Sequence, residues 1–410
     1  MKHSRQILLP SDVFPPRCGG AGWSAHALAL ALQARGEQVT ALVPATSTST
    51  LFAEPTTTID VHGVTTVRST VANHPWRIWR QSAMIAQLNQ SLRQLTTLTP
   101  TTIIHAQHIL SAHAALPLQR AHVKVVITVR DHWPWDMRAT GMQMQGDQRT
   151  WRGMYTTLRA RHQSWAMQAL IPAYIMQMRA RARLLQDAAA VIAVSAHMAA
   201  RIRQHVPRAR VVVIPNMVDI PSIHHKITTP PTIPVPDRFA LFVGKLEANK
   251  GAQLLPDLIR QIRPPALVVA GDGPLKEHIR AAAQQVNVPC YLLDWVEHDD
   301  VLRLMARCEA LWFPSSWDEP LSRVLLEALA CGAPIVAMPT GGTPEIIVDG
   351  VSGVIAPDHT TFVAHAQRLH EHPEQRERLR RGAIDHATRT FAVPVVIDQV
   401  LNLYAQIAST

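Results

Sequence analysis

Short apolar runs alternate with helical stretches along most of the chain, which is the pattern of a parallel α/β protein. The first apolar run, Gln6–Leu9, is followed by a Pro- and Gly-rich loop, a stretch of helical composition at Trp23–Arg35 and a second apolar run at Gln38–Val43. This order predicts a βαβ unit that opens a parallel sheet. Further strands are predicted at Thr102–His105, Val123–Val129, Ala189–Val194, Val211–Ile214, Phe239–Val243, Ala266–Ala270, Ala310–Phe313 and Pro334–Ala337.

The length and one unusual segment predict two domains. A chain of 410 residues exceeds what one hydrophobic core usually holds. Residues 221–238 are rich in Pro and Thr, which is typical of a linker, and we expect His224 and His225 within it to be solvated. We therefore predict an N-terminal Rossmann-like domain at residues 1–220 and a C-terminal one at residues 239–385.

The charge of the chain is unbalanced, with a formal net charge of +10. This excess indicates an anionic partner, such as a nucleotide, a lipid headgroup or a nucleic acid. No nucleic-acid-binding motif accompanies the charge, so a nucleic-acid partner is not expected. The four cysteines are scattered without a C-x-x-C pair, which argues against a disulfide framework or a zinc site and fits a reducing cytoplasm.

The sequence contains no segment expected to cross a membrane. The N-terminal apolar run ends at Pro10 and is too short for a signal peptide, and no window approaches the ~18 uninterrupted apolar residues of a spanning helix. A basic amphipathic segment at about residues 135–185 mixes Arg with Trp, Tyr, Met and Leu, so it could lie on an anionic membrane surface. The alternative is an ordinary helix pair that covers the sheet. We expect a cytoplasmic protein, either soluble or peripheral at the inner membrane face.

The stretch Leu311–Gly332 combines the features of a ligand-binding edge. A buried strand leads into a loop, and Ser322 is expected to cap a helix that runs through Ala330. The orphan amides of such a helix N-terminus favour an anion. Glu319 lies in the loop, and Glu327 lies past the first helical turn among Leu and Ala, where a carboxylate is costly unless something hydrogen-bonds it.

The surrounding residues EPLSRVLLEALACGAPIV, with the E-x7-E spacing of Glu319 and Glu327, resemble the retaining GT-B glycosyltransferases of family 4. That resemblance implies an α/β protein of GT-B architecture, in which two Rossmann-like domains with parallel sheets face each other across a cleft. It also implies that Glu319, at the catalytic position, contacts the hydroxyls of the donor sugar, and that Glu327 holds the ribose of the nucleotide. The alternative for the spacing alone is two unrelated glutamates on a surface helix.

Two lysines of the C-terminal half match a further motif of that family. GKLEANKG resembles G-R-L-x-x-x-K-G, with Lys245 where Arg is common and Lys250 at the family's Lys. Two ammonium groups near a turn suit a diphosphate, whose charge grows on the leaving oxygen as the glycosidic bond breaks. With the amides near Leu321 and Ser322 they would hold the departing diphosphate, so no metal is implied. Two solvent-facing lysines are the alternative.

Three further segments match the family in the C-terminal half. By resemblance, the turn at Gly341 and Gly342 borders the donor sugar, and the backbone around Val296 would meet the base, although Asp294 replaces the usual Gly in that segment. The last helix, in residues 386–410, is expected to pack back on the N-terminal domain.

The N-terminal half carries weaker matches. Its Pro- and Gly-rich loop resembles the family's PP-x-x-GG loop, with Arg17, Gly19 and Gly20 at the matching positions, and a plain tight turn is the alternative. In TVRD, Arg130 stands where many members have a His that contacts the donor sugar. Arginine stays charged and cannot transfer a proton, but it could bind a hydroxyl or a phosphate.

Histidines follow another predicted strand of this half. The family often has a His near the cleft at the position of His105, so this residue is a candidate for donor or acceptor contact. A core or surface histidine is the alternative. His105 and His108 are not expected to bind a metal, because no acidic or Cys partner is nearby.

The predicted function is metal-independent, retaining transfer of a hexose from a nucleoside diphosphate sugar to a hydroxyl of a glycan, glycolipid or small molecule. No cofactor is implied beyond the donor substrate. Two alternatives stay open: a GT-B nucleotide-sugar epimerase or hydrolase, and a basic peripheral-membrane binding protein without catalysis. A dinucleotide dehydrogenase is disfavoured, because the chain lacks G-x-G-x-x-G with an acidic residue ~20 positions on.

Overall fold

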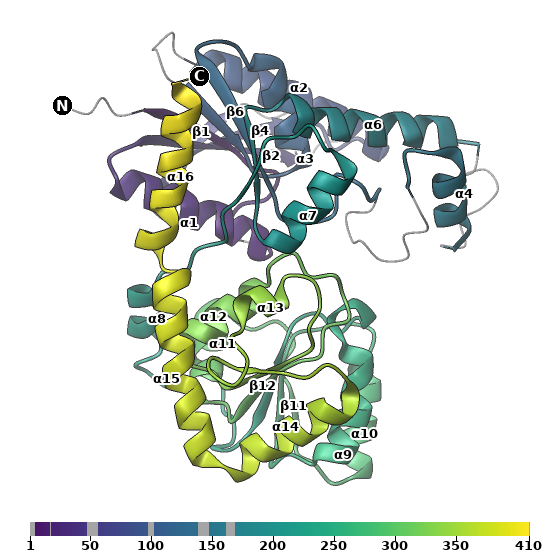
Figure 1. Cartoon of the computed structure of the whole chain (residues 1–410), viewed down its shortest axis with the longest axis vertical. Helices are drawn as coiled ribbons and strands as arrows, with labels where there is room; N and C mark the ends of the chain where they lie inside the picture. Colours follow the sequence, from purple (N-terminus) through teal and green to yellow (C-terminus); the bar gives the residue numbers. More distant parts are fainter. Residues whose placement is uncertain are drawn as a thin grey trace. The chain divides into compact units, whose positions relative to one another are not determined.

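The computed structural model describes residues 5–16, 18–46, 56–96, 102–137, 147–160 and 169–409, without the side chains of residues 77, 78 and 160 (Figure 1). Arg17 and parts of the predicted amphipathic segment lie outside the described residues. The chain divides into two compact units, one made of Met1–Pro215 with Val396–Thr410 and the other of Asn216–Val395. Each unit is built on its own sheet, as the alternation of apolar and helical stretches predicts.

The sheet of the first unit has eight strands in the order β3-β4-β2-β1-β5-β6-β7-β8. Every pairing among these described strands is parallel except that of β3 with β4. The strands are β1 Gln6–Pro10, β2 Gln38–Thr46, β3 Thr57–Val61, β4 Val64–Val71, β5 Thr102–Ala106, β6 Val123–Val129, β7 Ala190–Ala193 and β8 Val211–Val213. The helices are α1 Gly20–Ala34, α2 Arg77–Leu95, α3 Ile109–Ala115, η1 Leu116–Leu118, α4 Trp151–Ala160, α6 Ile171–Asp187, α7 Ala196–His205 and α16 Val393–Ala408.

Three described elements of the first unit, between β2 and β5, have no counterpart among the predicted ones. β3 and β4 form a hairpin, and α2 follows it. The turn of the hairpin is made by His62 and Gly63, which both have positive φ, 48° and 86°. Such a two-residue turn matches the twist of the strands that it joins. The Thr-rich strands hide their alternation in a polar composition, and this is why the pattern of apolar runs does not indicate them.

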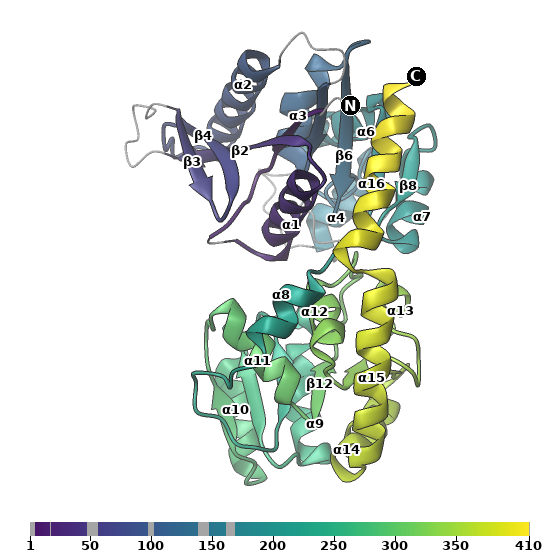
Figure 2. The ribbon, with the colours of Figure 1, turned by 90° about the vertical axis from the view of Figure 1, so that its left-hand side faces the viewer.

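The last helix belongs to the core of the first unit. The hydroxyl of Tyr404 on α16 lies 2.6 Å from Nδ1 of His105 on β5, and Asp398 pairs with Arg35 at the end of α1 at 2.7 Å. Tyr404 is fully buried. Figure 2 shows α16 beside the sheet of this unit.

The predicted amphipathic segment contains the helices α4 and α6, which pack against each other (Figure 1). They share a small apolar core made of Met154, Leu158, Ile171 and Met178. Arg181 of α6 joins the pair to the loop after β6, because its Nη1 donates to two backbone carbonyls of that loop at 2.9 and 3.0 Å. Among the helices that the structure describes, none is long and apolar enough to cross a membrane.

The sheet of the second unit has six parallel strands in the order β11-β10-β9-β12-β13-β14. The strands are β9 Ala240–Val243, β10 Leu267–Ala270, β11 Cys290–Leu292, β12 Ala310–Phe313, β13 Ile335–Ala337 and β14 Val354–Ile355. The helices are α8 Ile220–Lys226, η2 Ala248–Lys250, η3 Ala252–Leu254, α9 Leu255–Ile262, α10 Lys276–Gln285, α11 His298–Arg307, α12 Arg323–Cys331, α13 Thr343–Ile346, α14 His359–Glu371 and α15 Pro373–Thr390. The predicted strands of both halves are confirmed to within three residues at their ends.

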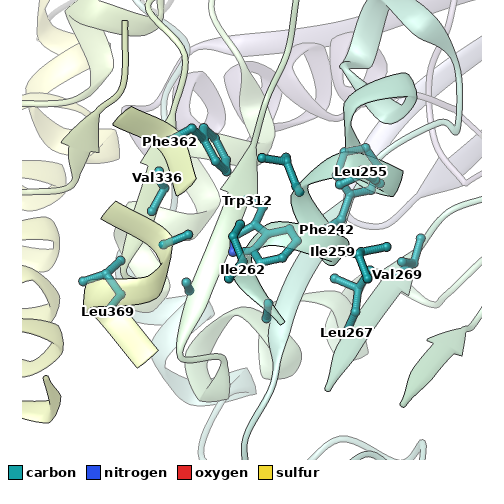
Figure 3. Packing of buried hydrophobic residues seen from close by; sticks show 14 of the residues in the cluster. Phe242, Leu255, Ile259, Ile262, Leu267, Val269, Trp312, Val336, Phe362 and Leu369 are labelled. Carbon is teal, nitrogen blue, oxygen red and sulfur yellow. The ribbon is translucent and has the colours of Figure 1, made fainter. Parts of the chain in front are cut away.

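A large apolar cluster fixes the central strands of the second unit. Trp312 of β12 lies in its middle, with Phe362 and Leu369 of α14 to one side and Ile259 of α9 and Leu267 of β10 to the other (Figure 3). The Trp312 and Phe362 rings meet edge to face, with centroids 6.5 Å apart. This packing holds the strand from which the Glu319 loop departs.

The segment predicted as a linker begins with helix α8. Asp219 caps this helix by accepting a hydrogen bond from the amide of Ser222 at 3.0 Å. His224 contacts the backbone oxygen of Ala330 through Nε2 at 3.0 Å, so the prediction that His224 is solvated is wrong. His225 is exposed, as expected.

Candidate functional site

The carboxyl ends of the adjacent strands β9, β12 and β13 carry the predicted donor-site residues. Lys245 and Lys250 follow β9, Glu319 follows β12, and the turn with Gly341 follows β13. Helix α12, which carries Glu327, begins directly after the β12 loop. The carboxyl ends of neighbouring parallel strands meet at one edge, where open α/β sheets bind their ligands. The structure therefore brings these residues to one edge of the second unit.

The Glu319 carboxylate is held by Lys250. Its Oε1 lies 2.7 Å from Nζ of Lys250 and 3.0 Å from the hydroxyl of Ser315. The Lys250 ammonium also lies 4.2 Å from the centre of the Trp317 ring, which is a cation–π distance. Because the Glu319 side chain is 3% exposed, its charge would be buried without compensation if Lys250 were absent. The alternative of a solvent-facing lysine therefore does not hold for Lys250.

Glycines let the neighbouring loops approach the backbone of Glu319. Gly341 has a φ of 55°, and a Cβ there would lie 2.2 Å from the carbonyl oxygen of Glu319. The amide of Gly342 donates to that same oxygen at 2.6 Å. A Cβ at Gly251, which follows Lys250, would lie 1.8 Å from the carbonyl oxygen of Pro314. The predicted turn at Gly341 and Gly342 thus fixes the loop that carries Glu319.

Glu327 is held by two different residues. Its Oε1 lies 2.7 Å from Nε of Arg323 and 3.0 Å from Nε2 of His298. Burial opposes ionisation of this carboxyl, but the Arg323 charge and the His298 hydrogen bond outweigh it and lower the pKa of Glu327. The carboxylate is therefore charged at neutral pH, although the rest of α12 around it is apolar and buried.

The two glutamates share one arrangement. In each, a cation and a second donor bind Oε1. Within the described ranges, Oε2 of Glu319 and Oε2 of Glu327 have no hydrogen-bond partner. Neither of these two oxygen atoms is fully buried. Each carboxylate therefore keeps one oxygen that can accept from the hydroxyl of a ligand.

Positive groups that have no partner within the described ranges lie at the same edge of the second unit. Lys245 is exposed, and in the part of the chain that the structure describes its ammonium makes no ion pair or hydrogen bond. The amides of Leu321 and Ser322, just ahead of α12, also donate to no acceptor there. Ser322 occupies the N-cap position, but its hydroxyl does not cap the helix, contrary to the prediction. An anion at this helix N-terminus would meet these donors.

The segment predicted to meet the base of the nucleotide, around Val296, follows β11. Val296 is buried, and Trp295 beside it is 72% exposed. Asp294 has a φ of 55°, which is the left-handed conformation that favours the glycine of the family motif. The Asp294 carboxylate forms an ion pair with Lys276.

In the first unit, the Gly-rich loop leads directly into α1. Gly19 is the N-cap and Gly20 the first helical residue, so the helix starts three residues before the predicted Trp23. A Cβ at Gly19 would meet no atom within 4 Å, whereas one at Gly22 would lie 2.5 Å from Sγ of Cys18. Packing within the described residues therefore requires the glycine at 22 and not the one at 19.

Polar side chains also follow the central strands of the first unit. Nη1 of Arg130, after β6, donates to Oε1 of Gln107, after β5, at 2.6 Å. Burial raises the pKa of Asp131 to about 6, although the amide of Trp133 donates a hydrogen bond to it. Burial also raises the pKa of Asp12, which follows β1 and accepts from two amides of α3. This edge therefore disfavours negative charge on its carboxyl groups.

His105 lies in the core of the first unit. Its ring is fully buried, with Nε2 2.6 Å from the hydroxyl of Thr128 and Nδ1 2.6 Å from that of Tyr404. Burial and the charge of Arg130 lower the pKa of His105 to about 3, so the ring is neutral. Both nitrogens are engaged within the fold, which corresponds to the core-histidine alternative. Over the described ranges, no group of three or more His, Cys, Asp or Glu side chains is placed to hold a metal ion.

Four residues of the site were not singled out from the sequence. Ser315 and Trp317 contact the Glu319–Lys250 pair, and His298 and Arg323 contact Glu327. Arg323 precedes Glu327 by four residues, and this spacing in a helix could have indicated the pair. His298 lies 29 residues from Glu327, and its spacing carries no such signal.

Two family models match the chain. The model of the glycosyl transferases group 1 matches residues 225–386, and the model of glycosyltransferase family 4 matches residues 18–221. The first match contains the site around Glu319 and Glu327, and the second contains most of the first unit. Together they account for most of the chain.

Among curated relatives, the spore coat protein SA of Bacillus subtilis is 31% identical over 185 residues, which are 41% of this chain and 48% of that protein. This match thus spans about half the length of the relative. A glycogen synthase of Mycobacterium tuberculosis is 26% identical over 422 aligned positions, covering 97% of this chain and 94% of the synthase.

Solved structures share the fold at low identity. A sucrose-phosphate synthase from Thermosynechococcus elongatus has a TM-score of 0.73 at 19% identity, covering 98% of this chain and 99% of that one. The Anabaena protein HepE in complex with UDP-glucose has a TM-score of 0.66 at 18% identity, covering 98% and 99%. These similarities establish the GT-B architecture, with its two Rossmann-like domains.

Proposed function

We propose that this chain, which belongs to the group 1 and family 4 glycosyltransferases of GT-B architecture, transfers a hexosyl group from a nucleoside diphosphate sugar to an acceptor hydroxyl with retention of the anomeric configuration. One observation carries the proposal. The buried Glu319 carboxylate is paired with Lys250 at 2.7 Å, at the strand edge that also carries Glu327 and the unpaired Lys245. This edge combines hydroxyl acceptors with positive charge, as an activated sugar requires.

A nucleoside diphosphate hexose is the proposed donor. The glycogen synthase relative and the UDP-glucose complex of HepE support this class of donor. The resemblance of the E-x7-E stretch to retaining enzymes supports retention. The acceptor is a hydroxyl of a glycan, a glycolipid or a small molecule.

The diphosphate would bind to the positive groups of the site. Lys245 and Lys250, with the amides of Leu321 and Ser322, would face its oxygens. These groups stabilise the charge that develops on the leaving phosphate, which is the electrostatic term that usually contributes most to catalysis. Metal independence is part of the proposal, because the two ammonium groups and the helix N-terminus can supply the positive charge.

The glutamates would bind the hydroxyls of the donor. Oε2 of Glu319 would accept from the sugar and Oε2 of Glu327 from the ribose, since Oε1 of each is already engaged. The turn at Gly341 and Gly342 would border the sugar, and the backbone at Val296 would meet the base. In the first unit, Arg130 would bind a hydroxyl or a phosphate, and Gly19 and Gly20 would permit a close approach of a ligand to the backbone.

The reaction exchanges one bond at the anomeric carbon. The bond from this carbon to the diphosphate oxygen breaks, and its electron pair leaves with the diphosphate. The acceptor oxygen forms the new bond on the same face of the sugar. The acceptor proton moves to the departing phosphate oxygen, so no protein side chain needs to act as the general base.

A ligand panel and product analysis test the proposal. UDP, GDP, ADP and their glucose conjugates at millimolar concentration are added in a thermal-shift assay, where a ligand of micromolar affinity adds roughly 4 kcal/mol of stability. The conjugate of the nucleotide that stabilises the protein is then incubated with glycan and lipid acceptors, with and without EDTA, and the anomeric configuration of the product is read by NMR. No stabilisation by any member of the panel would contradict the proposal.

Product analysis also distinguishes the proposed transferase from the alternative of a nucleotide-sugar epimerase or hydrolase. An epimerase or hydrolase would consume the nucleotide sugar without an acceptor at the rate measured with one. A transferase needs the acceptor, and its product contains the acceptor and the sugar joined.

We also propose that the pair α4 and α6 contacts an anionic membrane surface. Trp151, Leu170 and Met176 are 59%, 48% and 70% exposed, which is unusual for large apolar side chains. Exposed arginines accompany them on the same two helices, at Arg152, Arg159, Arg179 and Arg183. Sedimentation with anionic and neutral vesicles tests this contact, and the double variant Trp151→Ala, Met176→Ala should lose the anionic binding while keeping transfer to a water-soluble acceptor. Equal binding of the two proteins would contradict it.

A further inference from the structure

Two residues to which the family resemblance assigns no role hold Glu327. Arg323 lies in the first turn of α12, and His298 is the first residue of α11. Their donor nitrogens approach the same oxygen, Oε1, at 2.7 and 3.0 Å. Because an ionised carboxylate only accepts hydrogen bonds, the His298 ring must carry its proton on Nε2 in this contact.

Two donors on one oxygen fix the direction of the other oxygen. A carboxylate that made one contact could rotate about its last torsion, which is a soft one. Contacts from two different helices restrict that rotation and leave Oε2 unpaired within the described part of the chain. The arrangement therefore orients an acceptor before any ligand arrives.

Helix stability alone accounts poorly for this arrangement. A cation in the first turn of a helix opposes the helix dipole, and here Arg323 occupies that turn. The i, i+4 order, with the cation before the anion, is also the less favourable one. Glu327 lies among Leu325, Leu326, Ala328 and Leu329, all fully buried, where an apolar side chain would avoid the cost of burying a charge.

We propose that His298 and Arg323 are positioning residues, which orient the Glu327 carboxylate so that Oε2 accepts hydrogen bonds from the ribose of the nucleoside diphosphate. This inference rests on the proposed function and adds residues that act through Glu327. The ribose lies away from the bond that breaks, so its contacts are the same in the ground state and the transition state. Loss of such uniform binding raises KM for the donor and leaves kcat nearly unchanged.

A thermodynamic cycle tests the proposal: nucleotide affinity is measured with and without the His298 side chain, and with and without the ribose hydroxyls of the ligand. UDP, ADP and GDP are titrated calorimetrically into the wild-type protein, His298→Ala and His298→Gln, each alongside its 2′,3′-dideoxy counterpart. With the nucleotide that binds wild type most tightly, we expect His298→Ala to weaken binding about tenfold. The 2′,3′-dideoxy ligand should bind wild type and His298→Ala about equally, because it lacks both ribose hydroxyls from which Oε2 could accept.

The remaining variants separate positioning from a structural role. His298→Gln can place its side-chain nitrogen near the position of Nε2, so it should recover most of the lost affinity. Arg323→Gln should raise donor KM several-fold with kcat within about twofold of wild type. A thermal melt shows whether each variant is folded, and if Arg323→Gln does not fold, the His298 cycle decides alone.

The outcomes of the cycle are distinct. Equal weakening of the ribose and 2′,3′-dideoxy ligands by His298→Ala, or no weakening of either, would overturn the positioning role and leave the proposed function standing. A wild-type protein that binds none of the three nucleotides would overturn both.

Discussion

Both units place acidic side chains at the carboxyl ends of parallel strands. The second unit favours the ionised form of its carboxyl groups, whereas the first unit favours the neutral form. In the second unit, Glu319 is paired with the Lys250 ammonium, and Arg323 and His298 lower the pKa of Glu327 against the effect of burial. In the first unit, burial prevails and raises the pKa of Asp131 to about 6.

A histidine of the first unit follows the same rule. Burial and the Arg130 charge lower the pKa of His105 to about 3, which keeps the ring neutral. One type of sheet edge can therefore either preserve charge or suppress it, and the difference depends on whether a counter-charge is within hydrogen-bonding distance. The edge of the second unit therefore keeps its carboxylates charged, and that of the first unit favours the neutral form of Asp131.

The largest expected effect comes from removing the counter-charge of the second unit. Lys250→Ala should lower kcat about 10²–10³-fold, because the ammonium neutralises Glu319 and, in the proposed mechanism, would stabilise the leaving diphosphate. Steady-state kinetics with saturating donor measure this. Arg260→Ala, which removes an exposed ion pair with Asp257 on α9, is the control and should keep the wild-type kcat. A Lys250→Ala enzyme of near-normal kcat would mean that the pair only stabilises the fold.

The next effect comes from disturbing the backbone that supports Glu319. Gly341→Ala places a Cβ against the Glu319 backbone in a left-handed conformation and should cost more than about 3 kcal/mol of unfolding free energy. Gly350→Ala is a matched control, because Gly350 also has positive φ but no atom lies near its Cβ position. It should cost about 1–2 kcal/mol. Urea unfolding compares the two, and equal losses would show that contact with Glu319 is unimportant.

A smaller effect is expected from neutralising the Glu327 carboxylate. Glu327→Gln should lose about 2–3 kcal/mol of stability at neutral pH, because it deprives Arg323 of its charged partner. The folded-state pKa of Glu327 lies below the ordinary 4.5, so its contribution is present above pH 4.5 and is lost as the pH falls through the folded value. Urea unfolding at a series of pH values should show the variant and wild type converging in acid. A difference that persists there would contradict this assignment.

The smallest expected effect is a gain of stability instead of a loss, and it comes from neutralising Asp131 in the first unit. The pKa of Asp131 is raised from 3.8 to about 6, so the folded state binds its proton more tightly and stability falls as the pH rises between these values. Asp131→Asn should therefore be more stable than wild type above pH 6. The gain should vanish below pH 3.8. Destabilisation by Asp131→Asn at pH 7 would show that the unit does not suppress charge at this position.

The sequence predicts the parallel strands and the two glutamates well, because both are local patterns. Apolar runs mark the strands, and the residues around Glu319 and Glu327 carry the family motif. The hairpin of β3 and β4 is missed, since its Thr-rich strands show little apolar contrast and its turn is marked only by His62 and Gly63. Helix α8 is hidden by the Pro- and Thr-rich composition around it.

Contacts between distant residues could not be predicted in the same way. His105 is engaged by Tyr404, which lies 299 residues further along the chain. His298 reaches Glu327 from another helix, and no spacing rule connects them. The charge state of Asp131 depends on burial, which a single sequence does not quantify. The motif therefore identifies the residues that would touch the donor, and tertiary packing supplies those that orient them.

The bond between Tyr404 and His105 has a consequence for how the protein is made. Residues 1–215 leave the ribosome long before α16 does, yet the hydroxyl that completes the hydrogen bonding of the β5 histidine arrives only with α16. The unit that is translated first is thus the one that is finished last. A fragment ending at residue 215 would lack this bond and expose apolar surface, whereas residues 216–395 already contain their whole sheet and are the better choice for expression as an isolated piece.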